Sequence, residues 1–126
     1  MTRILVVHHD IDLADQEVES LRRYGYEARP CAGPTAGRPC PVYGGHTCWM
    51  ADEADVLVYD SFAAGDGDEE LLRGLRTMHP DKPVVVTSLG VSPDWPGLDN
   101  DPHVVLLTGA PTGARLAEAI ERAIAG

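Results

Sequence analysis

The sequence predicts an α/β fold in which helices cover both faces of a parallel β-sheet. Four short apolar runs rich in Val, Leu and Ile recur along the chain, with helical patterns between them. Each run is continuous rather than alternating between apolar and polar residues, which is typical of parallel strands buried on both faces. Because strands alternate with helices, we expect right-handed crossovers that build one sheet.

Five segments are predicted to be strands. The four strongest are residues 3–7, 55–59, 83–87 and 103–108. Residues 26–31 form a weaker fifth strand, which we expect at an edge of the sheet. The 126 residues are long enough to bury a core without disulfides, so we expect a single domain, residues 1–126.

The first helix is predicted from Ala14, Val18 and Leu21, whose spacing places them on one helical face. Gly25 follows this stripe. Glycine adopts the left-handed conformation that commonly ends a helix, so we expect the helix to stop there.

Two further helices are predicted nearer the carboxyl terminus. A short apolar pattern consists of Leu71, Leu75 and Met78. Asp66 or Asp68 precedes it and can cap the helix. The final apolar stripe consists of Leu116, Ala119, Ile120, Ala123 and Ile124. Thr112 is the expected N-cap of that last helix.

Two regions interrupt this alternation. Residues 32–47 contain three prolines and four glycines, and residues 90–102 contain three prolines and two glycines. Proline removes a backbone donor and clashes with the preceding turn, so we expect no long helix in either region. A short helix is expected to form at residues 48–53.

Composition and charge exclude several classes of function. The chain has 20 acidic and 10 basic residues, for a formal net charge of −10. Nucleic acids and anionic membranes require clustered Lys and Arg, so we expect neither as a partner. The first apolar run is too short for a signal peptide or a membrane span, which predicts a cytoplasmic protein. The chain ends at Gly126, directly after the last predicted helix, so we expect no attached DNA-binding output domain.

Polar residues follow the predicted strands at their carboxyl ends, where chemistry gathers in open parallel sheets. The first strand is followed by His8, His9 and Asp10, and Asp60 follows the third. Thr87, Ser88 and Ala110 stand at the ends of the last two strands.

This layout resembles the receiver domain of two-component response regulators over nearly the whole chain. The resemblance implies a flavodoxin-like, doubly wound five-stranded sheet in the order 2-1-3-4-5, with the second and fourth helices replaced largely by loops. It places Asp60 at the phosphoacceptor position of a phosphorelay. Ser88, with Thr87 beside it, matches the hydroxyl that responds to the phosphoryl group.

Four positions depart from the receiver pattern. His8 and His9 stand where receivers carry an acidic pair, Ala110 replaces the expected lysine, and Leu107 replaces a frequent aromatic residue. Mg²⁺ prefers oxygen ligands, whereas imidazole suits Zn, Cu, Ni or Fe. Conventional Mg²⁺-dependent phosphorylation is therefore not expected, although Asp10 lies one residue away and can supply one carboxylate.

Three interpretations of this cluster remain open. His8 and His9 can simply end the strand and hydrogen-bond to Asp60. They can belong to a transition-metal site. Alternatively, Asp10 and protonated histidines can rescue phosphotransfer to Asp60.

All three cysteines lie within residues 31–48, in the first irregular region or directly beside it. Cys31, Cys40 and Cys48, with His46, could hold tetrahedral zinc, although no Cys-x-x-Cys pair is present. An iron–sulfur cluster lacks its fourth cysteine. A reversible disulfide between Cys40 and Cys48 is a second interpretation, and buried thiols are a third. No cofactor is certain from the sequence, and zinc or another transition metal is the candidate.

The sequence therefore predicts a stand-alone, atypical receiver domain that signals through contacts with a protein partner or a second copy of itself. We expect no enzyme, because no nucleophile is convincingly paired with a base. One alternative is a single-domain response regulator phosphorylated on Asp60 by a histidine kinase. Another is a metal- or redox-responsive sensor built on residues 31–48.

Overall fold

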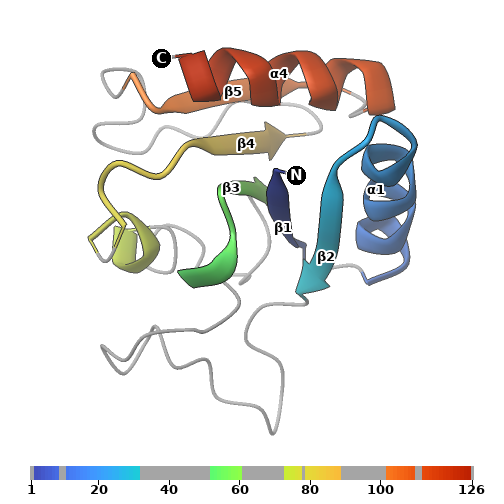
Figure 1. The fold of residues 1–126 in the computed structure, drawn as a ribbon, viewed down its shortest axis with the longest axis horizontal. Helices are drawn as coiled ribbons and strands as arrows, with labels where there is room; N and C mark the ends of the chain where they lie inside the picture. Colours follow the sequence, from blue (N-terminus) through green and yellow to red (C-terminus); the bar gives the residue numbers. More distant parts are fainter. Residues whose placement is uncertain are drawn as a thin grey trace, which may run out of the picture.

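The computed structural model describes residues 2–8, 11–31, 52–60, 73–77, 79–88, 102–109 and 112–125. The elements follow one another in the order β1 (Arg3–Val7), α1 (Ile11–Arg23), β2 (Glu27–Cys31), β3 (Val56–Asp60), β4 (Val84–Ser88), β5 (Val104–Thr108) and α4 (Gly113–Ala125). Figure 1 shows these elements along the chain. Residues 73–77 are also helical.

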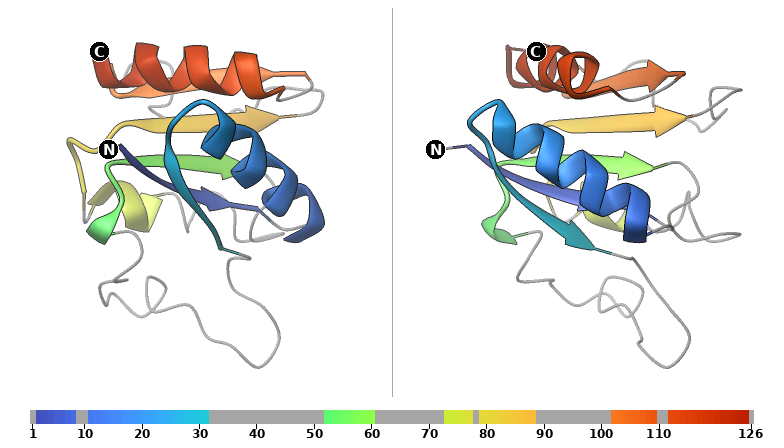
Figure 2. Two further views of the ribbon diagram at one scale, coloured as in Figure 1. Left: turned by 45° about the vertical axis from the view of Figure 1, so that its right-hand side comes forward. Right: turned by 90° about the vertical axis from the view of Figure 1, so that its right-hand side faces the viewer.

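The five strands form one parallel sheet in the order β2-β1-β3-β4-β5. The predicted fold class and strand order are therefore confirmed, and β2 lies at an edge as expected. Figure 2 shows the strands running in the same direction. A parallel sheet brings the carboxyl ends of β1, β3 and β4 to one edge, which is where the predicted site residues fall.

The core lies between the sheet and the pair α1 and α4. Ala14, Val18 and Leu21 of α1 and Ile120 of α4 are buried in one cluster with strand residues such as Val58. The opposite face of the sheet is also covered, because Leu5, Leu57, Tyr59, Val84 and Val86 are at most 3% exposed. Burial on both faces explains why the strand sequences are continuous apolar runs.

Helix α1 ends at the predicted glycine. Gly25 has a positive φ of 91°. Its N–H donates to the carbonyl of Arg22 at 3.1 Å, and the N–H of Tyr26 donates to the carbonyl of Leu21 at 3.2 Å. These two bonds form a Schellman motif, which satisfies the last carbonyls of the helix and turns the chain into β2.

Replacing Gly25 by alanine is expected to lower the free energy of unfolding by about 1–2 kcal/mol, because a Cβ atom disfavours the left-handed conformation. A Cβ atom at this position would meet no atom beyond the adjacent residues within 4 Å, so the loss is conformational rather than steric. Urea denaturation measures it. Gly25→Asn is the matched control, since asparagine tolerates this conformation, and an equal loss in both variants would contradict the explanation.

Helix α4 begins at the predicted cap. The Oγ1 atom of Thr112 accepts a hydrogen bond from the N–H of Arg115 at 3.3 Å, and the carbonyl of Thr112 accepts one from Leu116 at 2.9 Å. The hydroxyl of Tyr26 donates to Oε1 of Glu121 at 2.5 Å, which ties the start of β2 to α4. The sequence therefore identified the N-cap correctly.

The other predicted segments are described only in part. The helix predicted around Leu75 is present at residues 73–77, while Leu71 and Met78 lie outside the described residues. Residues 52 and 53 are helical, but the remainder of the irregular regions, residues 32–51 and 89–101, also lies outside them. The expectation of loops there stays a prediction. No helix in the described ranges is long and apolar enough to cross a membrane.

Candidate functional site

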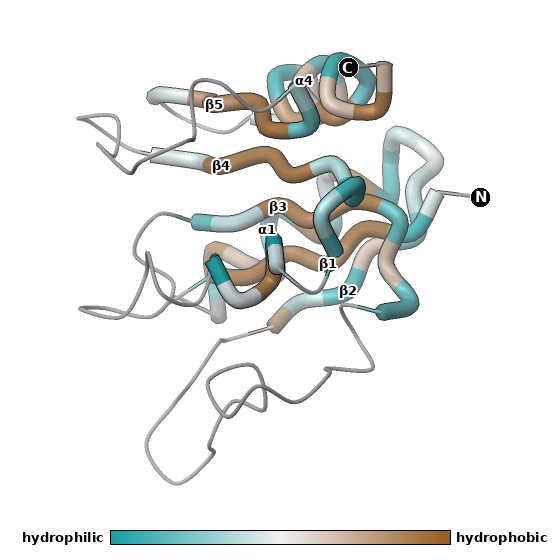
Figure 3. The backbone as a smooth tube through the Cα atoms, turned by 90° about the vertical axis from the view of Figure 1, so that its left-hand side faces the viewer, coloured by the Kyte–Doolittle hydropathy of each residue, from teal (hydrophilic) through white to brown (hydrophobic). Residues whose placement is uncertain are grey.

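Polar side chains gather where β1, β3 and β4 end. Asp60 is the last residue of β3, Ser88 is the last of β4 with Thr87 before it, and His8 directly follows β1. All four are at most 5% exposed. Figure 3 shows β3 changing from hydrophobic to hydrophilic at its carboxyl end and β4 changing from hydrophobic to intermediate. The parallel register pairs Asp60 with Thr87, so the sheet itself holds these side chains together.

The imidazole of His8 lies near two carboxylates. Its Nε2 atom is 3.9 Å from Oδ1 of Asp60 and 3.5 Å from Oε2 of Glu17. The backbone N–H of His8 donates to the carbonyl of Cys31 at 2.9 Å, which fixes the residue at the end of β1. This geometry supports the interpretation in which His8 interacts with Asp60, and it adds a second carboxylate that was not predicted.

Glu17 is the functional candidate that sequence reasoning missed. It lies on α1 and is 6% exposed. The sequence does contain an indication that Glu17 is buried. Glu17 is three residues after Ala14 and four before Leu21, and these two residues lie on the buried stripe of the helix. A charged residue at such a position is expected to face the core or a cavity.

The environment of Glu17 disfavours its charged form. Burial, and then the negative charge of Asp60, raise the pKa of the Glu17 carboxyl from an ordinary 4.5 to about 7. Its Oε1 atom has no hydrogen-bond partner among the described residues. The pKa of this carboxyl therefore lies near neutral pH, and His8 and Asp60 are the titratable groups that face it among the described residues.

A cavity of about 300 Å³ opens beside this cluster. Its walls come from α1, from the ends of β1, β3 and β4, and from the turn that leads into α4. Leu13, Gln16, Glu17 and Ser20 form the α1 side, and Gly113 belongs to the α4 side. The cavity makes the strand-end cluster a candidate binding site and not only a buried polar cluster.

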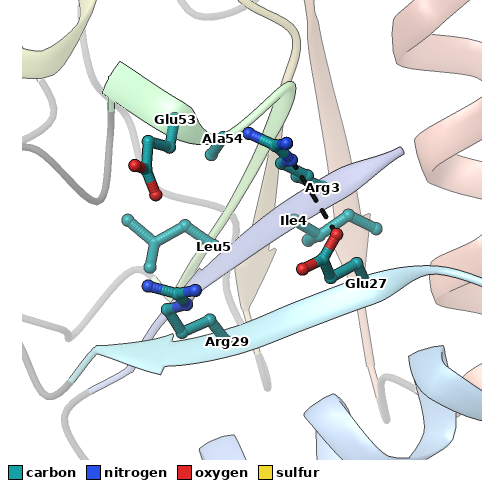
Figure 4. Close-up of a pocket in the computed structure, with 7 residues that line it drawn as sticks. All are labelled: Arg3, Ile4, Leu5, Glu27, Arg29, Glu53 and Ala54. Carbon is teal, nitrogen blue, oxygen red and sulfur yellow. Dashed lines mark ion pairs between the residues drawn. The ribbon is translucent and has the colours of Figure 1, made fainter. Parts of the chain in front are cut away.

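A smaller cavity of about 30 Å³ lies near the amino end of β1. Figure 4 shows its lining residues, including Arg3, Glu27 and Arg29. The ion pair between Arg3 Nε and Glu27 Oε2 spans 3.8 Å, and both side chains are more than half exposed, at 57% and 58%. Exposed pairs of this kind contribute little stability. The strand-end cluster therefore remains a stronger candidate for the functional site than this smaller cavity.

Among the described residues, this cluster offers two carboxylates and one imidazole to a cation, and Asp10 lies outside the described part of the chain. Mg²⁺ needs several oxygen ligands in near-octahedral geometry. Here an imidazole nitrogen lies within 4 Å of each nearby carboxylate, those of Asp60 and Glu17. No group of three or more His, Cys, Asp or Glu side chains in the described part of the chain is placed to hold a metal ion.

Several predicted site residues cannot be placed. His9, Asp10, Ala110, Cys40, His46 and Cys48 lie outside the described residues. Cys31 is a partly buried thiol at the end of β2. The zinc and disulfide interpretations of the cysteine region therefore stay predictions, testable by metal content and oxidation state in Cys40→Ser and Cys48→Ser. Leu107 is buried on β5, at 8% exposure.

No protein family model and no curated protein sequence matches this chain. Several solved structures do match this chain. A response regulator receiver domain protein from Clostridium thermocellum matches with a TM-score of 0.71 and 17% identity, over 99% of this chain and 95% of the other. The chemotaxis protein CheY4 from Vibrio cholerae matches with a TM-score of 0.70 and 17% identity, over 98% of both chains.

A third match is a response regulator protein from Burkholderia pseudomallei whose structure contains a phosphorylated aspartic acid, a calcium ion and citrate. It has a TM-score of 0.67 and 15% identity, over 95% of this chain and 66% of the other. At such low identities the likeness concerns the fold. The chain therefore has the fold of response regulator receiver domains, as its sequence pattern indicated.

Proposed function

We propose that this protein is a receiver-type signalling module that acts through protein contacts and does not use Mg²⁺-dependent phosphorylation of Asp60. The receiver fold supports a role in signal transduction. The observation that carries the finer claim is the imidazole of His8, which lies near both Asp60 and Glu17.

Phosphoryl transfer to an aspartate depends on positive charge that meets the transferred oxygens. Receivers obtain this charge from Mg²⁺ and a lysine, whereas this chain has His8 at an acidic position and Ala110 at the lysine position. Asp60 is also only 5% exposed. An imidazole is a poor ligand for Mg²⁺ and carries no fixed positive charge, so the reaction loses its main electrostatic support.

The partner is proposed to be another protein, or a second copy of this chain. A formal net charge of −10 favours a partner whose surface carries basic residues, because complementary charge accelerates association. A histidine kinase that phosphorylates Asp60 is the alternative partner, and it belongs to the alternative in which Asp10 and the histidines rescue the site.

Exposure to a small acyl phosphate donor in the presence of Mg²⁺ tests this proposal. The wild-type protein is expected to gain no more acid-labile phosphate than Asp60→Asn, because His8 and Ala110 replace residues that receivers use to supply positive charge. Intact mass at neutral pH, before and after acid treatment, measures the modification. A phosphoryl adduct on the wild type that Asp60→Asn lacks would favour the phosphorylated alternative.

A further inference from the structure

The cavity beside Glu17 has the size of a small ligand site. Its volume of about 300 Å³ is at the lower end of the range for small-molecule sites. One water takes up roughly 30 Å³ of liquid, so a single bridging water would leave most of this space empty. The volume therefore suits a compact organic ligand.

Glu17 points to what such a ligand must offer. Its side chain is 6% exposed, and its Oε1 atom has no hydrogen-bond partner within the described part of the chain. A buried polar atom in a folded protein nearly always has a partner, and a bound molecule is one way to supply it. Because Glu17 lines the cavity, a ligand there can reach this carboxyl group.

The described cavity lining has more acidic than basic side chains. It contains two carboxyl groups, Glu17 and Asp60, and includes no Lys or Arg among the residues described. Its one basic side chain, His8, faces both carboxyl groups already. An ammonium group has three donors and no acceptor, so it matches this lining, whereas an anion would meet two carboxylates.

We propose that this cavity binds a small organic cation with a primary ammonium group, for which Glu17 is the counter-ion. The ammonium group donates to Oε1 of Glu17, and the apolar part of the ligand packs against Leu13 at the rim, which is 37% exposed. The site adds ligand sensitivity to the signalling module. Ligand binding at this site does not depend on whether Asp60 is phosphorylated.

Titration with n-butylammonium chloride at pH 8 tests the site, with n-butanol as the neutral probe of similar shape. Amide chemical shifts in ¹H–¹⁵N NMR spectra report binding at Glu17, Ser20 and Gly113. Glu17→Gln removes the counter-ion and keeps the volume. Glu19→Gln makes the same change at an exposed position of α1 and is the matched control.

Saturable shifts are expected in the wild type and in Glu19→Gln, with affinity at least about tenfold weaker in Glu17→Gln, because a charge-assisted hydrogen bond is lost. Leu13→Ala keeps Glu17 but removes the apolar contact at the rim, and it is expected to weaken binding while circular dichroism shows a folded chain. The proposal is overturned if the wild type shows no saturable shift, if Glu17→Gln binds equally well, or if n-butanol binds as tightly as the amine.

Discussion

Replacing Ile120 by alanine is expected to lower the free energy of unfolding by about 2–5 kcal/mol. Ile120 is fully buried on α4 and belongs to the cluster that joins α4 to α1 and the sheet. Truncation removes apolar contacts and leaves a cavity that the surrounding strands cannot fully close. Urea denaturation, followed by circular dichroism, measures the loss.

Ile124→Ala is the matched control, because it makes the same chemical change one turn later on the same helix. Ile124 is 44% exposed, so its truncation is expected to lower stability by less than about 1 kcal/mol. Equal losses in the two variants would mean that α4 does not pack on the sheet through the Ile120 face. That result would contradict the fold described above.

Glu17→Gln is expected to raise the free energy of unfolding by on the order of 2–3 kcal/mol at pH 8 and by less than about 1 kcal/mol at pH 5. The amide keeps the volume of the side chain but carries no charge. At pH 8 the wild-type protein must bury an ionised carboxyl near Asp60, and the variant is relieved of this cost. Urea denaturation at the two pH values measures the difference.

The direction of the pH effect follows from the pKa of Glu17, which is about 7 in the folded protein against an ordinary 4.5. Between these values the folded state binds more protons than the unfolded state, so this group's contribution to stability falls as the pH rises. Above pH 7 the Glu17 carboxyl is ionised in both states, and the full cost of burying its charge is present. Glu19→Gln, at an exposed position, is expected to change stability little at either pH. A larger gain at pH 5 than at pH 8 would contradict the assignment.

The sheet was predictable because its strands are buried on both faces. Continuous apolar runs such as Ile4–Val7 leave no polar face to solvent, and this pattern distinguishes parallel strands from edge hairpins. The end of α1 and the start of α4 were also predictable. Gly25 adopts the left-handed conformation that ends a helix, and the side chain of Thr112 caps the first turn of α4.

The candidate site was predictable only in part. The gathering of His8, Asp60 and Ser88 follows from parallel topology, since each residue ends a strand. Glu17 was missed because a charged residue on a helix is usually solvated, and only its register with Ala14 and Leu21 indicates burial. The distance of 3.5 Å between His8 Nε2 and Glu17 Oε2 depends on how α1 packs on the sheet, which no local pattern specifies.

The most direct test of the proposed function is a titration of the wild-type protein with Mg²⁺, followed through the amide chemical shifts of His8, Asp60 and Ser88. The imidazole of His8, near Asp60 and Glu17, is expected to prevent saturable shifts across the millimolar range. His8→Asp restores a carboxylate at this position and is the control in which saturable shifts are expected. Saturable binding of Mg²⁺ at Asp60 in the wild type would contradict the central claim.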